Sequence, residues 1–279
     1  MTLPTDIASP ETVNADSQAI ASQLVAARQR ARPLGSFPGT MPGDLYSAYQ
    51  VQDAGIELWG QPIGGWKVGR IPLDLEEGLG IDRLAGPIFA DTIKLADSGA
   101  QIEMPMYVGG FAAIEAEFVA VIDRDAPGDK LAWSPDDALA MIADLRIGLE
   151  IASSPLADIN DLGPTAVVSD FGNNRGLVVG PSINNWQSRA LESMRCSAAI
   201  DGQMMGSGGA FNLTGGFVRS VQFLLELMAR RGRPLRSGDM IATGQTTGIH
   251  DIAAGQIGEV DFGDDGKLYV KMLPAEPAN

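Results

Sequence analysis

Apolar residues follow two different periods along the chain, and the change occurs near Ile63. Before it, apolar side chains recur every three or four positions. This spacing predicts one helix that starts at Asp16 or Ser17 and ends before Pro33, and a second that starts at Asp44. After Ile63, short apolar runs that alternate or continue for a few residues predict strands instead.

The region after Ile63 is mostly extended. Two helices are predicted within it: one from Ser134 to about Arg146, which has strong start signals, and the amphipathic segment Phe217–Arg231. The dipeptide Asp201-Gly202 predicts a tight hairpin. The predicted strands cover residues 66–69, 88–90, 114–122, 147–152, 175–180, 240–243, 259–262 and 268–272.

These elements indicate an α+β fold. We expect a small N-terminal helical region over residues 1–62, whose first 14 residues form a loose tail, and a β-rich domain over residues 63–279 with a mixed sheet and covering helices. The strands are too many, and the helices between them too few, for a regular alternation of strand and helix.

Charge narrows the range of partners. The 279 residues carry a formal net charge of −15, which disfavours binding to nucleic acid and to anionic membranes. A small anionic substrate would need a local positive charge to overcome this field, and a bound divalent cation would supply one.

The supply of metal ligands and nucleophiles is small. Cys196 and His250 are the sole cysteine and histidine, so an internal disulfide is impossible and a typical zinc site cannot form. A Ser-His-Asp triad would have to use His250, and no G-x-S-x-G motif is present. Any metal therefore needs oxygen ligands, as magnesium, manganese and calcium do. The lone cysteine, together with the lack of a signal-peptide pattern or a long apolar run, predicts a cytoplasmic protein.

Glutamates interrupt two apolar strands. Glu115 and Glu117 lie two positions apart in the predicted strand 114–122, so their side chains point to the same face. Glu150 interrupts a second apolar run, Ile147–Ala152, in the same way. Like charges in a buried strand require protons or a cation, which makes the three a candidate hard-cation site. The alternative is a solvated face on an edge strand, with Glu150 in a salt bridge.

Several segments together resemble one family. They include Gly65-Trp66-Lys67-Val68-Gly69, Ile114-Glu115-Ala116-Glu117, Leu149-Glu150-Ile151, Ser169-Asp170 and Ala242-Thr243-Gly244. With them, residues from about Ala48 to Phe262 resemble the fumarylacetoacetate hydrolase superfamily, in its branch of 2-keto-4-pentenoate hydratases and 4-oxalocrotonate decarboxylases. The resemblance implies the β-rich mixed-sheet roll of that family.

The resemblance also implies a site. Glu115, Glu117 and Glu150 would hold Mg²⁺ or Mn²⁺, and Lys67 would carry protons in catalysis, with a surface lysine as the alternative. In the family, the cation chelates a 2-keto acid and stabilises its enolate. A lysine that is partly buried near a cation has its ammonium form disfavoured and exchanges protons near neutral pH.

The predicted substrate residues rest on weaker signals. Arg70 would bind a carboxylate or be a solvated arginine, and Asn173 would line the site with Asp170 or belong to a plain turn. Thr243 and Thr246 lie in a Gly-rich loop that would hold the substrate or form an ordinary β-turn. His250, just beyond this loop, is a candidate site residue or a structural histidine.

The substrate half of the site departs from the family pattern. Arg70-Ile71-Pro72 stands where the hydratases have a small polar pair, Arg83-Leu84-Ala85-Gly86 lacks an expected aspartate, and Ser153-Ser154-Pro155 lacks an arginine. We therefore predict a metal-dependent hydratase, a hydro-lyase, that acts on a 2-hydroxydienoate or 2-keto-enoate such as 2-keto-4-pentenoate in the degradation of aromatic or related rings. A decarboxylase or carbon–carbon bond hydrolase on a 2-keto acid, and an inactive β-rich binding protein, remain the alternatives. A homo-oligomer is expected.

Overall fold

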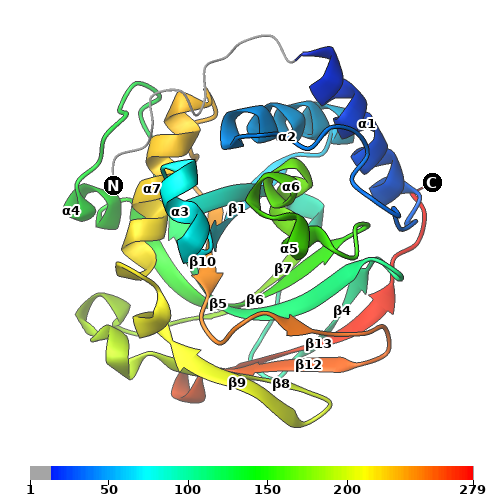
Figure 1. Cartoon of the computed structure of the whole chain (residues 1–279). Helices are drawn as coiled ribbons and strands as arrows, with labels where there is room; N and C mark the ends of the chain where they lie inside the picture. Colours follow the sequence, from blue (N-terminus) through cyan, green and yellow to red (C-terminus); the bar gives the residue numbers. More distant parts are fainter. Residues whose placement is uncertain (1–13, 279) are drawn as a thin grey trace.

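The computed structural model describes residues 14–278, and these form two β-sheets and a set of helices (Figure 1). Of the predicted loose tail, all but Asn14 lies outside the described residues. The helices are α1 (Ala15–Gln29), α2 (Leu45–Trp59), α3 (Leu73–Leu79), α4 (Pro135–Leu139), α5 (Ile159–Leu162), α6 (Pro164–Ser169) and α7 (Gly216–Arg230). The strands are β1 (Ile63–Arg70), β2 (Arg83–Phe89), β3 (Ile93–Leu95), β4 (Gln101–Met106), β5 (Phe111–Ile122), β6 (Ile142–Ser154), β7 (Asn174–Ser182), β8 (Arg195–Ile200), β9 (Gln203–Gly209), β10 (Met240–Gln245), β11 (His250–Asp251), β12 (Ile257–Asp261) and β13 (Lys267–Pro274).

The larger sheet is mixed and has the strand order β2-β1-β10-β5-β6-β7-β3, with β11 paired to β5. β5 and β6 are its long central pair and run antiparallel, whereas β1 is parallel to β10 and β3 is parallel to β7. The smaller sheet has the order β4-β13-β12-β8-β9. The predicted α+β class and the mixed-sheet roll are confirmed.

The two faces of the larger sheet have different neighbours. Figure 1 shows α1, α2, α5 and α6 on one side and the smaller sheet on the other. On β5, Ile114 and Phe118 face the smaller sheet: Ile114 lies against Gly258, and the ring of Phe118 meets that of Phe262 edge-on, with centroids 5.4 Å apart. Because side chains alternate along a strand, the residues between them, including Glu115 and Glu117, face the side of α5 and α6.

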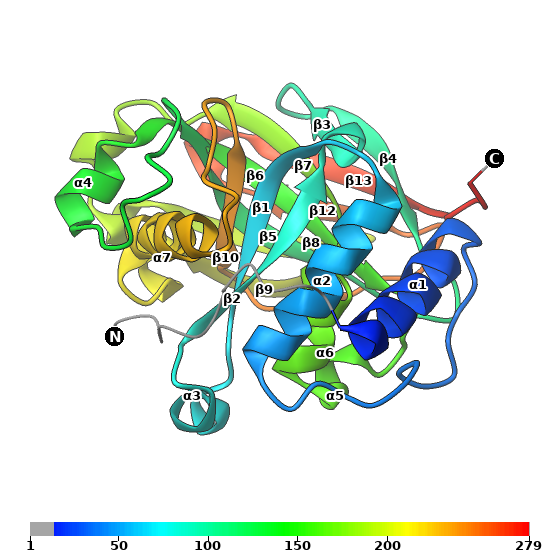
Figure 2. The same cartoon turned by 90° about the horizontal axis from the view of Figure 1, so that it is seen from above.

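The N-terminal helices pack onto the rest of the chain through polar as well as apolar contacts. Gln52 of α2 donates to the carbonyls of Ala85 and Val168, and Arg28 of α1 reaches Asp170. Figure 2 shows α1 and α2 side by side above the edge of the sheet that holds β1 and β2. Apolar residues of α2 belong to the same buried cluster as those of β1, β5 and α7. The division of the chain at residue 62 stays a prediction.

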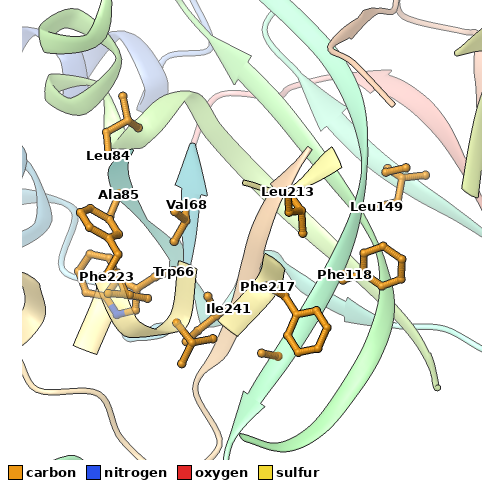
Figure 3. Packing of buried hydrophobic residues seen from close by; sticks show 14 of the residues in the cluster. Trp66, Val68, Leu84, Ala85, Phe118, Leu149, Leu213, Phe217, Phe223 and Ile241 are labelled. Carbon is orange, nitrogen blue, oxygen red and sulfur yellow. The ribbon is translucent and has the colours of Figure 1, made fainter. Parts of the chain in front are cut away.

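Part of the core lies under α7, on the face of β1 opposite Lys67. Figure 3 shows Trp66 and Val68 of β1, Ile241 of β10 and the phenylalanines of α7 packed in one cluster. Trp66 and Val68 point away from Lys67, which lies between them in the strand. This packing fixes β1 in the sheet and thereby fixes where the lysine stands.

Most predicted elements are confirmed, with two corrections. The helix predicted from Ser134 to about Arg146 starts where expected, with Ser134 as its N-cap, but its predicted end is wrong, because α4 ends at Leu139 and β6 begins at Ile142. From Leu145 onward every second residue is apolar, as in a strand with one buried face. β6 accordingly pairs with the whole length of β5. The first helix is capped by Asn14, whose side chain accepts a hydrogen bond from the Ser17 amide, and not by Asp16 or Ser17.

No helix among residues 14–278 is long and apolar enough to cross a membrane.

Candidate metal and substrate site

The predicted acidic residues meet on the helix-facing side of the larger sheet. Glu115 and Glu150 are direct cross-strand partners on β5 and β6, and Glu117 lies opposite Gly148. One carboxylate oxygen from each of the three glutamates lies within 4.8 Å of the others, and all three side chains are buried. The solvated-face alternative is therefore wrong. The residues next to them on this face are apolar, among them Val119, Leu177 and Ala242.

The carboxylates are only partly satisfied by hydrogen bonds. A bulge at Thr243–Gly244 in β10 brings the Gly244 amide to Glu117 Oε2 at 2.9 Å, and the Asn174 amide group donates to Glu150 Oε1, also at 2.9 Å. Glu117 Oε1 and Glu150 Oε2 are buried and have no hydrogen-bond partner. These oxygens are unsatisfied acceptors, and they point to a ligand that accepts electron pairs.

Burial changes the acidity of the glutamates. It raises the pKa of Glu115 to about 7, a shift that Lys67 opposes and Glu150 reinforces. Burial raises the pKa of Glu117 well above its usual value, and the charges of Glu150 and Glu115 raise it further. Three oxygen donors of this kind, with two open acceptor atoms, fit a hard divalent cation such as Mg²⁺ or Mn²⁺.

Lys67 stands beside this cluster. It is buried, and its Nζ lies 3.7 Å from Glu150 Oε1. Burial disfavours its ammonium form, but the charges of Glu150, Glu115 and Glu117 outweigh this effect and raise the pKa of Lys67. The expected direction was for a lysine beside a bound cation, whereas carboxylates without one favour the charged lysine. A cation bound to the same carboxylates would remove most of that effect.

A left-handed turn places Asn173 near Lys67. Phe171, Gly172 and Asn173 all have positive φ, at 56°, 67° and 62°. This conformation is costly for the two residues that are not glycine. The turn crosses β2 at Gly86, where a β-carbon would lie 2.2 Å from the Phe171 carbonyl oxygen. Asn173 Oδ1 is buried without a hydrogen-bond partner. Asn173 is thus a turn residue that also lines the same cavity as Lys67.

A cavity of about 250 Å³ joins these groups to the surface. Lys67, Glu115, Asn173 and Thr243 lie in its wall, and so do Arg70 and Arg83. Its apolar wall includes Leu84, Pro164, Val167, Leu213 and Ile249. The volume lies below the roughly 300–1,000 Å³ of sites for drug-sized ligands, which indicates a small substrate.

Two of the predicted substrate residues do not line this cavity. Asp170 forms a buried ion pair with Arg28, whose Nε lies 2.5 Å from Asp170 Oδ1, and it also accepts a hydrogen bond from Ser154. The hydroxyl of Thr246 donates to the Ala116 carbonyl and contacts the Cys196 sulfur. Both residues support the strands that carry the glutamates. Thr243 does line the cavity, although its hydroxyl donates to the Phe118 carbonyl.

His250 is a structural neighbour of the site. It belongs to β11, which pairs with β5, and its Nε2 lies 3.1 Å from the Thr247 hydroxyl. Burial lowers its pKa, so the ring is neutral at pH 7. It is not among the residues that line the cavity.

Sequence reasoning missed two contributors. Arg83 was noted only as a departure from a family pattern, yet it is buried at the cavity mouth and is the one charged residue of strand β2. That isolation in an apolar strand was a usable signal. Arg28 gave no signal, because nothing in the pattern of the first helix shows that one of its arginines is buried against Asp170.

Comparison with known proteins identifies the family. Residues 85–272 match the model of the fumarylacetoacetate hydrolase C-terminal domain, which is more than half of the chain. The chain therefore belongs to the fumarylacetoacetate hydrolase family, in the branch of 2-keto-4-pentenoate hydratases and 4-oxalocrotonate decarboxylases.

Individual relatives are distant but cover most of the chain. A 2-keto-4-pentenoate hydratase of Burkholderia vietnamiensis is 25% identical over 81% of this chain and 85% of its own length. The TodF product hydratase of Pseudomonas putida is 26% identical over 83% of this chain and 85% of its own length. Among solved structures, a 4-oxalocrotonate decarboxylase of Pseudomonas putida G7 with magnesium and adipate has a TM-score of 0.75 at 21% identity, over 92% of this chain and 97% of that one.

Proposed function

We propose that this protein is a divalent-metal-dependent hydratase that acts on a 2-hydroxydienoate or 2-keto-enoate of the 2-keto-4-pentenoate type. The observation that carries the proposal is the buried cluster of Glu115, Glu117 and Glu150 with Lys67 beside it, at the inner end of a small cavity. The similarity to the 2-keto-4-pentenoate hydratase of Burkholderia vietnamiensis and to the TodF product hydratase favours hydration over the other reactions of the family.

The three glutamates would hold Mg²⁺ or Mn²⁺ through their unsatisfied oxygens. Bound there, the cation would supply Lewis acidity to the keto oxygen and carboxylate of a 2-keto acid. Asn174 and Gly244 orient two of the glutamates by hydrogen bonds, and Arg28 holds the carbonyl of Asn174 at 2.9 Å.

Lys67 is the proposed proton carrier. Its Nζ holds a proton 3.7 Å from Glu150 and lines the cavity, so it can exchange that proton with a substrate bound over the glutamates. The net reaction is the ketonisation of a dienol followed by addition of water across the remaining carbon–carbon double bond. Asn173 contributes an amide group with an open acceptor, which suits contact with a substrate hydroxyl or with the incoming water.

The test uses protein freed of metal by exhaustive chelation and then reloaded with magnesium or manganese. Each form is mixed with 2-hydroxypenta-2,4-dienoate, the loss of the dienol absorbance is followed, and the product is identified by NMR. We expect a hydroxylated 2-keto acid only from the reloaded protein. Full turnover by the metal-free protein would contradict the metal role. Release of carbon dioxide from a dicarboxylic dienol would indicate the decarboxylase, and a metal-loaded protein that binds 2-keto acids without turnover would indicate a binding protein.

A further inference from the structure

The cavity has a second charged end. Arg70 and Arg83 are cross-strand partners at the end of the β1–β2 pair, and both line the same cavity as Lys67 and Glu115. Lys67 and Arg70 are three residues apart on β1, which is about 10 Å along an extended strand. Between the two ends, the wall carries Leu84, Val167 and Leu213. The cavity is thus polar at both ends and apolar in the middle.

Arginines and acidic side chains lie together at the mouth. Arg70 Nη2 lies 2.9 Å from Glu76 Oε1, Arg83 pairs with Asp82, and Arg219 Nη2 lies 3.8 Å from the other oxygen of Asp82. Three guanidinium groups therefore lie together at this point, in a protein whose net charge is −15. Such a cluster makes the mouth a local positive region, which suits a charge-assisted hydrogen bond to a substrate carboxylate.

Arg83 is the better-placed of the two lining arginines. Its side chain is 5% exposed, compared with 41% for that of Arg70. Burial lowers the pKa of Arg83, Asp82 opposes this, and the nearby charges of Arg219 and Arg70 lower it further. Arg83 donates to the Thr214 carbonyl and Arg70 to the Thr214 hydroxyl, so one loop residue orients both guanidinium groups. A positive charge that is buried and crowded by others favours an incoming carboxylate.

We propose that Arg83 and Arg70 form a second carboxylate subsite, so that the protein selects dicarboxylic 2-keto acids over monocarboxylic ones. The inference rests on the proposed function, since it assumes that the keto acid end lies over the glutamates. The preferred substrate would then be a short dicarboxylic dienol or 2-keto-enoate, in place of a pentenoate, with its distal carboxylate at the cavity mouth.

The subsite also bears on the reaction. A carboxylate that is paired with arginines in the ground state loses this stabilisation if it leaves as neutral carbon dioxide. Arginines at the mouth thus oppose loss of that carboxylate and suit a reaction, such as hydration, in which it stays on the substrate.

Calorimetric binding to the magnesium-loaded protein tests the subsite without turnover. The probes are 2-oxohexanedioate and 2-oxohexanoate, which have the same chain length and differ only in the distal carboxylate, and pyruvate, which reports the keto acid end alone. We expect the parent to bind the dioate about tenfold to a hundredfold more tightly than the monoacid, as a charge-assisted pair predicts. Arg83→Gln should abolish most of this preference, Arg70→Gln should reduce it several-fold, and neither should change pyruvate binding.

Arg236→Gln is the matched control. It makes the same change of charge at an exposed arginine paired with Asp125, away from the cavity, and it should keep the full preference. Equal binding of the two six-carbon acids by the parent would overturn the subsite while leaving the proposed function intact. Failure to bind pyruvate in the presence of magnesium would overturn both. If Arg83→Gln does not fold, Arg70→Gln and the preference of the parent still decide the matter.

Discussion

The two ends of the cavity differ in how their charges are held. At the inner end, Glu115, Glu117 and Glu150 stand in the middle of the long central strands, fully surrounded, and two of their oxygens have no partner. At the mouth, Arg70 is the last residue of β1 and Arg83 is the first of β2, and each already contacts an acidic side chain. The inner end thus holds carboxylate oxygens that are fixed in position and lack partners. The mouth holds guanidinium donors at strand ends.

This difference suggests a division of labour. Residues in the middle of paired strands cannot move without breaking the ladder, so they suit a role in which position matters most. Residues at strand ends and on the connecting helix α3 can be exchanged at little cost to the sheet, so they suit the choice of substrate. The family motifs agree with this, because the segments around the glutamates match the pattern and those around Arg70 and Arg83 depart from it.

The largest expected effect is at the inner end. Glu150→Gln should fold, because an amide of equal size relieves repulsion among the buried carboxylates. It should lose measurable turnover, and it should also lose the rise in melting temperature that magnesium gives the parent, about 2.7 kcal/mol of added stability at a hundredfold excess over Kd. Thermal melts with and without magnesium, and turnover at saturating metal, measure both. Glu192→Gln, at an exposed glutamate, is the control. A magnesium response in Glu150→Gln equal to that of the parent would remove Glu150 from the ligand set.

Lys67→Ala should separate chemistry from metal binding. The variant removes a proton carrier and keeps the three glutamates, so turnover should fall by roughly 10²–10⁴-fold while the magnesium-induced rise in melting temperature persists. Lys94→Ala, at an exposed lysine, serves as the control for the loss of a positive charge. Normal turnover in Lys67→Ala would show that the proton comes from elsewhere.

The sequence predicted the inner end better than the mouth, for a physical reason. An alternating strand fixes which side chains share a face, so Glu115 and Glu117 could be paired from spacing alone. Glu150 stood out as a glutamate in a second apolar run, and the family resemblance added Lys67. Which side chains gather at a cavity mouth depends on how separate segments meet in space. Arg83 and Thr214 are 131 positions apart, and no local pattern connects them.

The errors in the fold have a similar origin. The residues Ser134-Pro135-Asp136-Asp137 start a helix as predicted. Where the helix ends depends on tertiary contacts, because the chain from Ile142 onward pairs with β5 as a strand instead of continuing the helix. Asp170 was placed in the substrate site because the motif Ser169-Asp170 matched. Its partner Arg28 lies on a helix more than a hundred residues earlier and also donates to carbonyls of β6 and β7, which spacing cannot show.

Asp170→Asn tests whether Asp170 stabilises the fold or contacts the substrate. Removing one charge leaves Arg28 buried without its ionic partner, which costs about 3–5 kcal/mol of unfolding free energy. We expect this loss in denaturant melts, with KM for the folded enzyme nearly unchanged, because Asp170 does not line the cavity. Asp125→Asn breaks an exposed pair instead and should leave stability almost unaltered. A large rise in KM with normal stability would instead return Asp170 to the substrate site.

The smallest expected effect is the pH dependence of magnesium binding, and it concerns the inner end alone. The pKa of Glu115 is about 7 in the folded metal-free protein and starts from an ordinary value of 4.5. Its proton therefore stabilises the native state below pH 4.5, and this contribution is lost as the pH rises through about 7. Magnesium needs the ionised carboxylate, so its affinity should rise about tenfold per pH unit for each proton released, up to about pH 7. Melts between about pH 5.5 and pH 8 should show the metal-free melting temperature falling while the magnesium-induced rise grows. Glu115→Gln should lose the growing magnesium response, because it lacks a ligand, and should show a smaller fall of the metal-free melting temperature, because Glu117, whose pKa is also raised, still titrates. A magnesium response that is constant across this range would mean that Glu115 is already ionised before the metal binds.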